Sequence, residues 1–285
     1  MDLRALWGYE GKNCVVVGAA SGMGKAATEL LLELGANVYA ADFNEVAPPV
    51  KQAFRVDMSD KDQIDQLLTQ LPDRIDKVFT CHGIAMFPGN AVKVMLVNFI
   101  SHRYFIEALL PRISEKGAVC MIASDGGYGW QHFWGFTAPL LATKTFEEAH
   151  EWAKANEEEI EKNMSYCVAK RAQVSYMKAN AWAPEFIGKY IRINTISPGA
   201  TQTGLTADFN KSAGQGDEAA GDAGIRGMYL TGWNGWYAMP EDMGYPMVFI
   251  NSDMAGYISG QDLNISYGID ASRDVAALNA GLQSG

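Results

Sequence analysis

The sequence predicts an α/β fold, a doubly wound parallel sheet in a single domain of 285 residues. Three observations predict it. A β-branched run, residues 15–17, ends at Gly18 and leads through a glycine-rich turn into a helical pattern. Strand-like and helix-like segments then alternate along the chain, which is typical of parallel strands joined by crossover helices. Polar residues such as Asp42 and Ser124 follow strand-like segments, at the sheet edge where such folds hold their ligands.

The glycine-rich turn lies in residues 13–27, NCVVVGAASGMGKAA, and has the spacing G-x3-G-x-G. Glycine permits positive φ and lets the backbone approach a pyrophosphate without a Cβ in the way. Free N–H groups at the start of the following helix add positive potential. The turn predicts a nucleotide site, and an ordinary tight strand-to-helix connection is the alternative. The residues expected to contact a cofactor here are Gly18, Ser21, Gly22, Met23 and Gly24.

The next strands supply further candidate cofactor residues. Residues 37–43 form a second strand ending in Asp42, whose carboxylate would accept hydrogen bonds from the adenosine ribose and repel a 2′-phosphate. The position therefore favours NAD over NADP, and an acidic loop residue is the alternative. Asp57 follows a short third strand within reach of the adenine edge, and Gly83 ends a fourth strand at residues 77–85. The cofactor residues expected from this part of the chain are Asp42, Phe43, Asp57, Met58 and Gly83.

The alternation continues to the last third of the chain. A long helix is predicted at residues 94–113 and contains Asn98, and a strand at 118–124 ends at Ser124. A second long helix then carries Tyr166, and a strand follows at 191–200. Two segments, 128–165 and 203–245, are too long for plain connections. We expect the first to be a helical insert and the second a substrate loop.

The second half of the insert has the pattern of an amphipathic helix. Thr145 and Glu148 have capping-box spacing, and the opposite face carries many glutamates. An apolar stripe runs along it, made of Phe146, Ala149, Trp152, Ala153 and Ile160. The stripe needs an apolar partner, either the late loop of the same chain or another subunit. The insert is accordingly a pocket wall, a subunit interface or a packed excursion.

Tyr166 and Lys170 form Y-x-x-x-K, and their i, i+4 spacing places both side chains on one helix face. A free tyrosine has a pKa near 10, which makes it a poor acid or base at neutral pH. An ammonium group a few ångströms away would favour the phenolate and lower that pKa. Ser124 could donate to a substrate oxygen beside the phenol, and a helix-capping or turn serine is the alternative.

Composition excludes several function classes. The net charge of −10 argues against binding to nucleic acid or to anionic lipid, so a small-molecule partner is expected. Four cysteines, at positions 14, 81, 120 and 167, lack C-x-x-C spacing, which favours buried free thiols over a metal site or disulfides. The first residues have no signal-peptide pattern, and no apolar run is long enough to span a bilayer. We expect a cytoplasmic protein without a metal.

Taken together, the motifs resemble those of the short-chain dehydrogenase/reductase family, in family order and over nearly the whole chain. The matching stretches are GAASGMG (18–24), CHGIA (81–85), VNF (97–99), IAS (122–124), YCVAK (166–170) and NTISPGATQT (194–203). The resemblance implies a Rossmann-type fold and NAD-dependent oxidoreductase activity on an alcohol or ketone. It also implies a catalytic tetrad of Asn98, Ser124, Tyr166 and Lys170. The nicotinamide would lie at Pro198 and Gly199, with its carboxamide held by Thr201 and Thr203.

The chain departs from the family pattern at two places. Cys81 and His82 replace the usual Asn-Ala, which we expect to be a structural substitution near the adenosine, and ISYG at 265–268 stands where D-G-G is typical. A short link between Gly83 and Asn98 and the insert before Tyr166 resemble the bacterial 3α-hydroxysteroid dehydrogenase/carbonyl reductase branch.

The aromatic residues suggest the substrate class. A hydroxysteroid or bile acid would suit the bulky side chains after Ser124 and in the late loop. The expected substrate residues are Trp130, Phe133, Trp134, Trp233 and Trp236, with Met228, Tyr229 and Tyr237 beside them. A reductase of smaller cyclic or aromatic carbonyls is the first alternative, and a non-catalytic NAD(H)-binding regulator is an alternative from another class. We expect a homo-oligomer, a dimer in preference to a tetramer.

Overall fold

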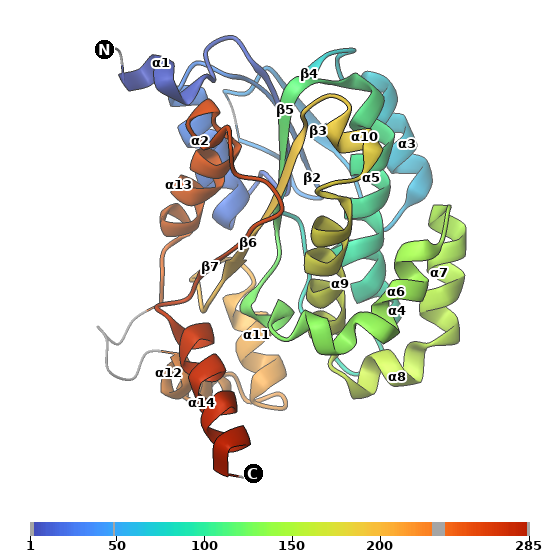
Figure 1. Cartoon of the computed structure of the whole chain (residues 1–285), viewed down its shortest axis with the longest axis vertical. Helices are drawn as coiled ribbons and strands as arrows, with labels where there is room; N and C mark the ends of the chain where they lie inside the picture. The colour runs from blue at the N-terminus through green and yellow to red at the C-terminus, as the bar shows by residue number, and fades with distance from the viewer. Residues whose placement is uncertain (1–2, 48, 230–236, 284–285) are drawn as a thin grey trace.

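A parallel sheet runs through the centre of the protein (Figure 1). The computed structural model describes residues 3–47, 49–229 and 237–283. Within them the sheet has seven strands in the order β3-β2-β1-β4-β5-β6-β7. Their bounds are β1 Asn13–Val17, β2 Asn37–Asp42, β3 Gln52–Arg55, β4 Ile75–Thr80, β5 Ile113–Ile122, β6 Arg192–Pro198 and β7 Asp262–Ile265. The order confirms the predicted Rossmann-type fold. Successive strands are added toward one edge of the sheet up to β3 and toward the other edge from β4 onward, and such sheets bind their ligands at the point between β1 and β4 where this change occurs.

Helices cover both faces of the sheet (Figure 1). One face carries α2 (Gly22–Glu33) and α13 (Pro240–Asn251), and the other carries α3 (Lys61–Gln70), α5 (Ser101–Leu109) and α9 (Ser165–Asn180). Alternate residues of β1 supply the two cores, because Val15 and Val17 pack on the α9 side and Cys14 and Val16 on the α2 side. Burial on both faces explains why the strand is a continuous apolar run.

The long helix predicted over residues 94–113 is interrupted. α4 (Ala91–Met95) passes into a π-helical turn, η1 (Leu96–Ile100), before α5 begins, and a 3-10 turn, η2 (Leu110–Arg112), ends it. π-turns of this kind are frequent at functional sites. Asn98 lies in the middle of this one.

The insert is helical, as expected, but it is divided into short helices. These are η4 (Trp130–Phe133), α6 (Trp134–Ala142), α7 (Phe146–Ala155) and α8 (Glu157–Lys162), and a 3-10 turn, η3 (Asp125–Gly127), precedes the insert. The capping box is half formed, because Thr145 Oγ1 accepts from Glu148 N at 3.1 Å while Glu148 Oε2 accepts from Lys144 N instead. The break after α7 falls at Asn156, whose side chain donates back to Trp152 O at 2.8 Å.

The apolar stripe of the insert has its partner within the same chain. Phe146, Ala149, Ala153 and Ile160 are all buried and belong to the core cluster that α5 and α9 build. Both predicted partners, the late loop and a second subunit, were wrong for these residues. The stripe instead covers the long helices around Asn98 and Tyr166.

The late segment, predicted as a loop over 203–245, is largely helical. It contains α11 (Thr206–Ala213), α12 (Glu218–Tyr229) and the start of α13. Gly221 permits a close contact between α12 and α11, since a Cβ there would lie 1.8 Å from Asn210 O. The C-terminal helix α14 (Ile269–Gln283) lies beside α11 and α12, beyond the carboxyl ends of the strands (Figure 1).

Three short helices complete the described chain: α1 (Leu3–Trp7), α10 (Pro184–Ile187) and η5 (Asp253–Ala255). None of the helices in the described ranges is both long and apolar enough to cross a membrane.

Candidate active site

A cavity of about 920 Å³ lies at the carboxyl ends of the strands. Its size and mostly apolar lining are typical of a site for a small ligand. Its wall contains every residue that the sequence predicted for cofactor contact, from Gly18 to Thr203. Ser124, Tyr166 and Lys170 line the same cavity. Segments separated by most of the chain's length therefore meet at one place.

The glycine turn is built as a close approach between strands. Gly18 has φ +86°, and a Cβ there would lie 2.5 Å from His82 N. A Cβ on Gly24 would lie 2.0 Å from Gly18 O, so neither position admits another residue. Ser21 precedes α2 without a side-chain hydrogen bond to its first turn. The backbone N–H groups of that turn thus stay available to an anion.

Asp42 is fixed at the end of β2 by two backbone donors. Its Oδ2 accepts from Ala20 N at 3.0 Å, and its Oδ1 accepts from Asn44 N at 2.8 Å. The carboxylate is held over the glycine turn, and each oxygen keeps a lone pair for a ligand hydroxyl. Asp57 also lines the cavity, with Oδ1 accepting from Ser59 N at 2.8 Å. A glycine cradle beside a fixed carboxylate fits the diphosphate and ribose of a dinucleotide.

Asn98 supports the cavity from behind its wall. It is fully buried, its Oδ1 accepts from Ile84 N at 2.8 Å, and its Nδ2 donates to Ile84 O at 2.9 Å. A Cβ on Gly83 would lie 3.4 Å from Asn98 Oδ1. The π-turn therefore fixes the segment that follows β4.

Tyr166 and Lys170 lie one helical turn apart on α9. Lys170 Nζ is 5.5 Å from the Tyr166 ring centroid and donates to Ile122 O at 2.7 Å. Burial raises the pKa of the Tyr166 phenol, a hydrogen bond with Ser124 lowers it, and the charge of Asp125 raises it. Burial also lowers the pKa of Lys170 to about 7. The expected lowering of the phenol pKa by the ammonium group is thus opposed by burial, which favours the neutral form of both groups.

Ser124 is both a capping residue and a site residue. It precedes η3, its Oγ accepts from Gly126 N at 3.1 Å, and it donates to Asp125 Oδ1 at 3.1 Å. The two interpretations offered by the sequence are compatible, because the cap fixes the hydroxyl at the mouth of the cavity.

The segment after β6 forms another part of the wall. Pro198, Gly199, Thr201 and Thr203 all line the cavity. Thr203 is held by a turn in which its N–H donates to Thr206 Oγ1 at 2.7 Å. A Cβ on Gly199 would lie 3.0 Å from Ser266, so the glycine permits contact with the chain after β7.

The aromatic residues of the insert that were expected to bind the substrate do not line the cavity. Trp130, Phe133 and Trp134 are absent from the described residues that line it. Trp130 packs against the core and meets Trp134 edge to face at 6.4 Å, and Phe133 lies under the Arg171 guanidinium at 3.8 Å. The insert thus places Phe133 against α9 and leaves Trp134 43% exposed, so the expectation that these three rings line the cavity is wrong. Trp233 and Trp236 lie outside the described residues.

Other residues take their place, and sequence reasoning missed several of them. Phe209 meets the Tyr166 ring edge to face at 5.0 Å. The predicted Met228, Tyr229 and Tyr237 do line the cavity. The missed lining residues include Met86, Asp125, Tyr128, Phe209, Ile225 and Arg273. The only available signal was the position of Asp125 and Tyr128 directly after Ser124.

His82, the departure from the family pattern, is part of a buried polar cluster. Its ring stacks on His102 with centroids 3.7 Å apart, and its Nε2 lies 3.0 Å from Ser101 Oγ. Ser101 gives its own proton to Val97 O, so it accepts from His82 Nε2–H, which leaves Nδ1 as the buried lone pair. Burial lowers the pKa of His82 to about 3. A neutral ring of this kind agrees with the structural role expected for it.

Two family models and several known proteins match this sequence. The family model described as short chain dehydrogenase matches residues 12–156, and the one described as Enoyl-(Acyl carrier protein) reductase matches residues 153–270. A coniferyl-alcohol dehydrogenase of Pseudomonas sp. (strain HR199 / DSM 7063) is 29% identical over 208 residues, 72% of this chain and 78% of that protein. A 3-alpha-hydroxysteroid dehydrogenase/carbonyl reductase of Comamonas testosteroni is 28% identical, covering 90% of this chain and 96% of that protein.

A solved structure is also similar, that of the 3-alpha-hydroxysteroid dehydrogenase from Pseudomonas sp. B-0831 complexed with NADH. Its TM-score is 0.74 at 21% identity, and the match covers 92% of this chain and 98% of that one. At this identity the similarity supports the fold alone.

Proposed function

The chain belongs to the short-chain dehydrogenase/reductase family, as an NAD(P)-dependent oxidoreductase acting on CH–OH groups, and we propose that it interconverts a secondary alcohol and a ketone with NAD(H). The proposed substrate class is a hydroxysteroid or bile acid. The observation that carries the proposal is the meeting of Ser124, Tyr166 and Lys170 with the glycine turn in one cavity.

In the proposed mechanism the protein moves a proton and orients the substrate. The nicotinamide supplies the hydride acceptor or donor when it is bound. Tyr166 takes the alcohol proton during oxidation and returns it during reduction, and the protonated Lys170 beside it favours the phenolate. Ser124 donates a hydrogen bond that orients the substrate oxygen beside the Tyr166 hydroxyl. Asn98, fixed to Ile84, would anchor the water that carries the proton onward.

The preference for NAD rests on Asp42. A 2′-phosphate on the adenosine ribose would have to approach a carboxylate whose position is fixed by Ala20 N and Asn44 N. Because the carboxylate cannot turn away without losing both hydrogen bonds, the repulsion is not easily relieved. Arg55 of β3 lies opposite Asp42 in the strand register, but its Nε–H donates to Phe43 O at 3.2 Å.

The substrate class rests on the cavity. Met86, Phe209, Ile225 and Met228 give it apolar walls suited to a flat ring system. A smaller cyclic or aromatic substrate is the second candidate. It is favoured by the displaced indole rings of Trp130 and Trp134 and by the similarity to a coniferyl-alcohol dehydrogenase. A non-catalytic regulator has less support, because every tetrad position carries a functional side chain.

We also propose a homodimer. The insert covers the long helices on its side of the sheet with its own apolar stripe. That face is thus unavailable to a second subunit, which favours a dimer over a tetramer.

A substrate panel tests the function. Purified protein is incubated with NAD and, in turn, hydroxysteroids, bile acids, cyclic alcohols and coniferyl alcohol, and formation of reduced nicotinamide is followed by absorbance. The proposal is supported if hydroxysteroids or bile acids have the highest kcat/KM in the panel. A higher kcat/KM for the small alcohols would move the assignment to the second candidate.

A further inference from the structure

Asp125 joins the site serine to two helices near the C-terminus. Its Oδ1 accepts the Ser124 hydroxyl proton at 3.1 Å. Its Oδ2 accepts from the Tyr229 hydroxyl at the end of α12 and from Arg273 on α14, whose Nη2 lies 3.4 Å away. All three of these partners line the cavity. A single carboxylate therefore connects Ser124 to residues more than a hundred positions later in the chain.

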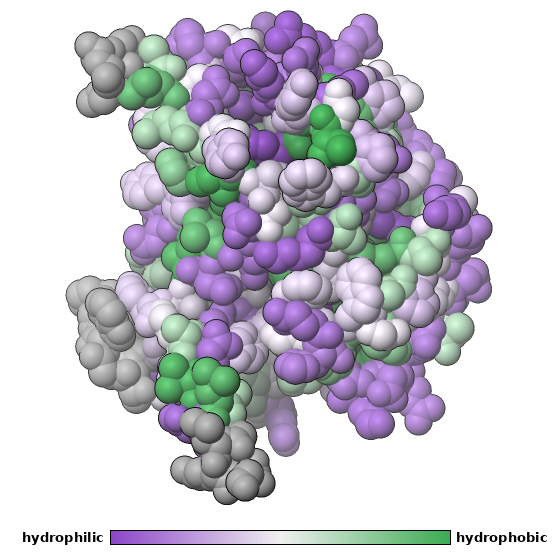
Figure 2. Space-filling model, in the orientation of Figure 1, coloured by the Kyte–Doolittle hydropathy of each residue, from purple (hydrophilic) through white to green (hydrophobic). Residues whose placement is uncertain are grey.

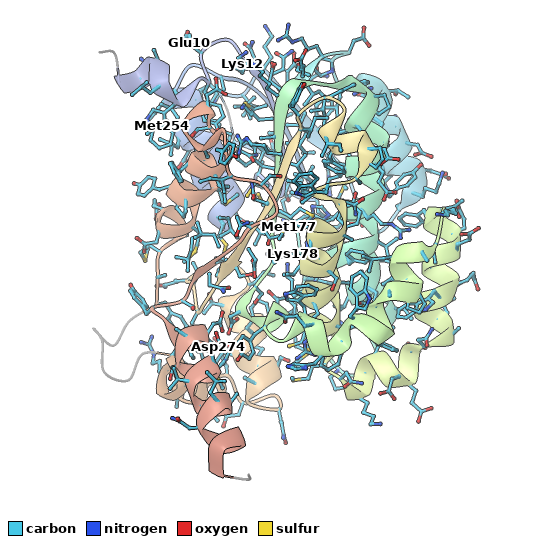
Figure 3. The ribbon with its side chains drawn as sticks, viewed as in Figure 1. Glu10, Lys12, Met177, Lys178, Met254 and Asp274 are labelled. Carbon is cyan, nitrogen blue, oxygen red and sulfur yellow. The ribbon has the colours of Figure 1, made fainter. Side chains whose placement is uncertain are left out.

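The contact is charged and largely shielded from water. The Asp125 side chain is 11% exposed and that of Arg273 is 31% exposed. Arg273 also donates to Asp270 Oδ1 at 2.9 Å, and its guanidinium lies 5.6 Å from the Tyr128 ring centroid. Tyr128 in turn donates to Asp274 Oδ1 at 2.7 Å, the residue labelled on α14 in Figure 3. Arg273 is thus held in place on two sides, and its charge offsets that of Asp125.

The Ser124 hydroxyl has only one proton to donate. In the structure that proton is directed to Asp125, and the oxygen accepts from Gly126 N. A substrate oxygen that gains negative charge during hydride transfer needs the same proton. A carboxylate without other donors would retain it, because hydrogen bonds to an ionised acceptor are about twice as strong as neutral ones. The donors on Asp125 Oδ2 weaken this competition.

We propose that Arg273 is a positioning residue that acts through Asp125, releasing the Ser124 hydroxyl from the carboxylate to the substrate oxygen. Tyr229 assists by donating to the same oxygen of Asp125. No covalent step is involved, since the hydroxyl rotates from one acceptor to another. The inference rests on the proposed function, in which Ser124 donates to the substrate oxygen. The proposal makes the orientation of the Ser124 hydroxyl toward the substrate oxygen depend on the packing of α14 against the cavity.

The test is a double-mutant cycle on the best alcohol substrate with NAD. Arg273→Met removes the charge and should lower kcat by about 10- to 100-fold. Asp125→Asn removes the competing charge and keeps an acceptor, so it should lower kcat less than Arg273→Met does. The double variant should return to the Asp125→Asn level, because Arg273 is needed only while Asp125 is charged. Arg273→Lys should recover part of the loss.

Two further measurements separate this role from a structural one. The Kd of NADH, followed by fluorescence, and the melting temperature are recorded for each variant, and the NADH Kd should stay within about twofold of the wild type. Lys211→Met is the matched control, since Lys211 pairs with Glu218 at 3.8 Å between α11 and α12 away from Ser124. It should leave kcat unchanged.

The outcomes are distinct. Wild-type kcat in Arg273→Met, or a loss that Asp125→Asn does not reverse, would overturn the inference while leaving the proposed function in place. A wild type that binds NADH but oxidises none of the alcohols would overturn the proposed function, and the inference with it.

Discussion

Burial governs the protonation of the two titratable groups at the centre of the site. The Tyr166 phenol and the Lys170 amine are both held in their neutral forms more strongly than in water. Lys170 is 3% exposed and has one backbone acceptor, Ile122 O. Its charge is therefore costly to the folded protein, and this cost is a consequence of placing an ammonium group beside the tyrosine that it assists.

The cost predicts a pH-dependent difference in stability between the wild type and Lys170→Met. The folded pKa of Lys170 is lowered from 10.5 to about 7, so the unfolded chain binds the proton more tightly between these values. The penalty is absent above pH 10.5, grows as the pH falls and is complete below about pH 7. Urea unfolding should show Lys170→Met more stable by on the order of 4 kcal/mol at pH 7.

The difference should shrink toward pH 10, because folded Lys170 is already neutral there and the unfolded chain loses its proton increasingly as the pH approaches 10.5. Lys178→Met is the control, since that lysine also donates to a backbone carbonyl, Gly260 O at 2.8 Å, but is less buried than Lys170. A stability difference that does not change with pH would contradict the account.

Asp42 predicts the cofactor preference. The wild type should favour NAD over NADP by at least about tenfold in kcat/KM, which corresponds to roughly 1.4 kcal/mol of repulsion between the carboxylate and the 2′-phosphate. Asp42→Asn removes the charge and retains one acceptor, so it should lower the preference for NAD mainly by raising kcat/KM with NADP. Steady-state kinetics with both cofactors measure it. Equal use of the two cofactors by the wild type would refute the assignment.

At the scale of elements, the insert packs against the core, and its residues Trp130, Phe133 and Trp134 do not line the cavity. Phe133 packs against Arg171 of α9 and the apolar stripe lies in the core, while polar side chains gather on the outside over α8 (Figure 2). Phe133→Ala and Trp134→Ala should therefore change KM for a bulky alicyclic substrate and for a small ketone by the same factor. Parallel KM measurements decide the point. A selective rise for the bulky substrate would return these rings to the cavity wall.

The sequence was sufficient where local chemistry determines the structure. The glycine turn was predictable because positive φ at Gly18 and the close approach at Gly24 exclude other residues. The end of β2 at Asp42 was predictable because apolar strands lead to polar ligand sites.

Other features depend on contacts that no local pattern encodes. The π-turn at Leu96–Ile100 has no sequence signature of its own, and Gly221 of α12 stands in a glycine-rich stretch typical of a loop although it permits a contact with α11. Asp125 and Arg273 are 148 residues apart, so their pairing depends on how α14 packs. The rings of Trp130 and Trp134 could not be oriented because both ends of the insert, but not its path, were fixed by Ser124 and Tyr166.

At the scale of the whole molecule, the covered helix face predicts the assembly. Because α7 and α8 pack over the long helices, that face is closed to a second subunit, and the proposed homodimer should give twice the chain mass in light scattering. Ile160→Ala leaves a cavity beneath the insert and should lower the stability of the fold by about 2 to 5 kcal/mol without changing that mass. A monomer or a tetramer at micromolar concentration would contradict the prediction.

The central claim is that Tyr166 exchanges the proton in an NAD-dependent oxidation of an alcohol. The most direct measurement compares the wild type with Tyr166→Phe, which removes only the hydroxyl, by single-turnover formation of reduced nicotinamide and by the Kd of NADH. The account predicts a rate lower by about 10² to 10⁴ with a nearly unchanged Kd. A Tyr166→Phe variant that oxidises the best alcohol at the wild-type rate would contradict it.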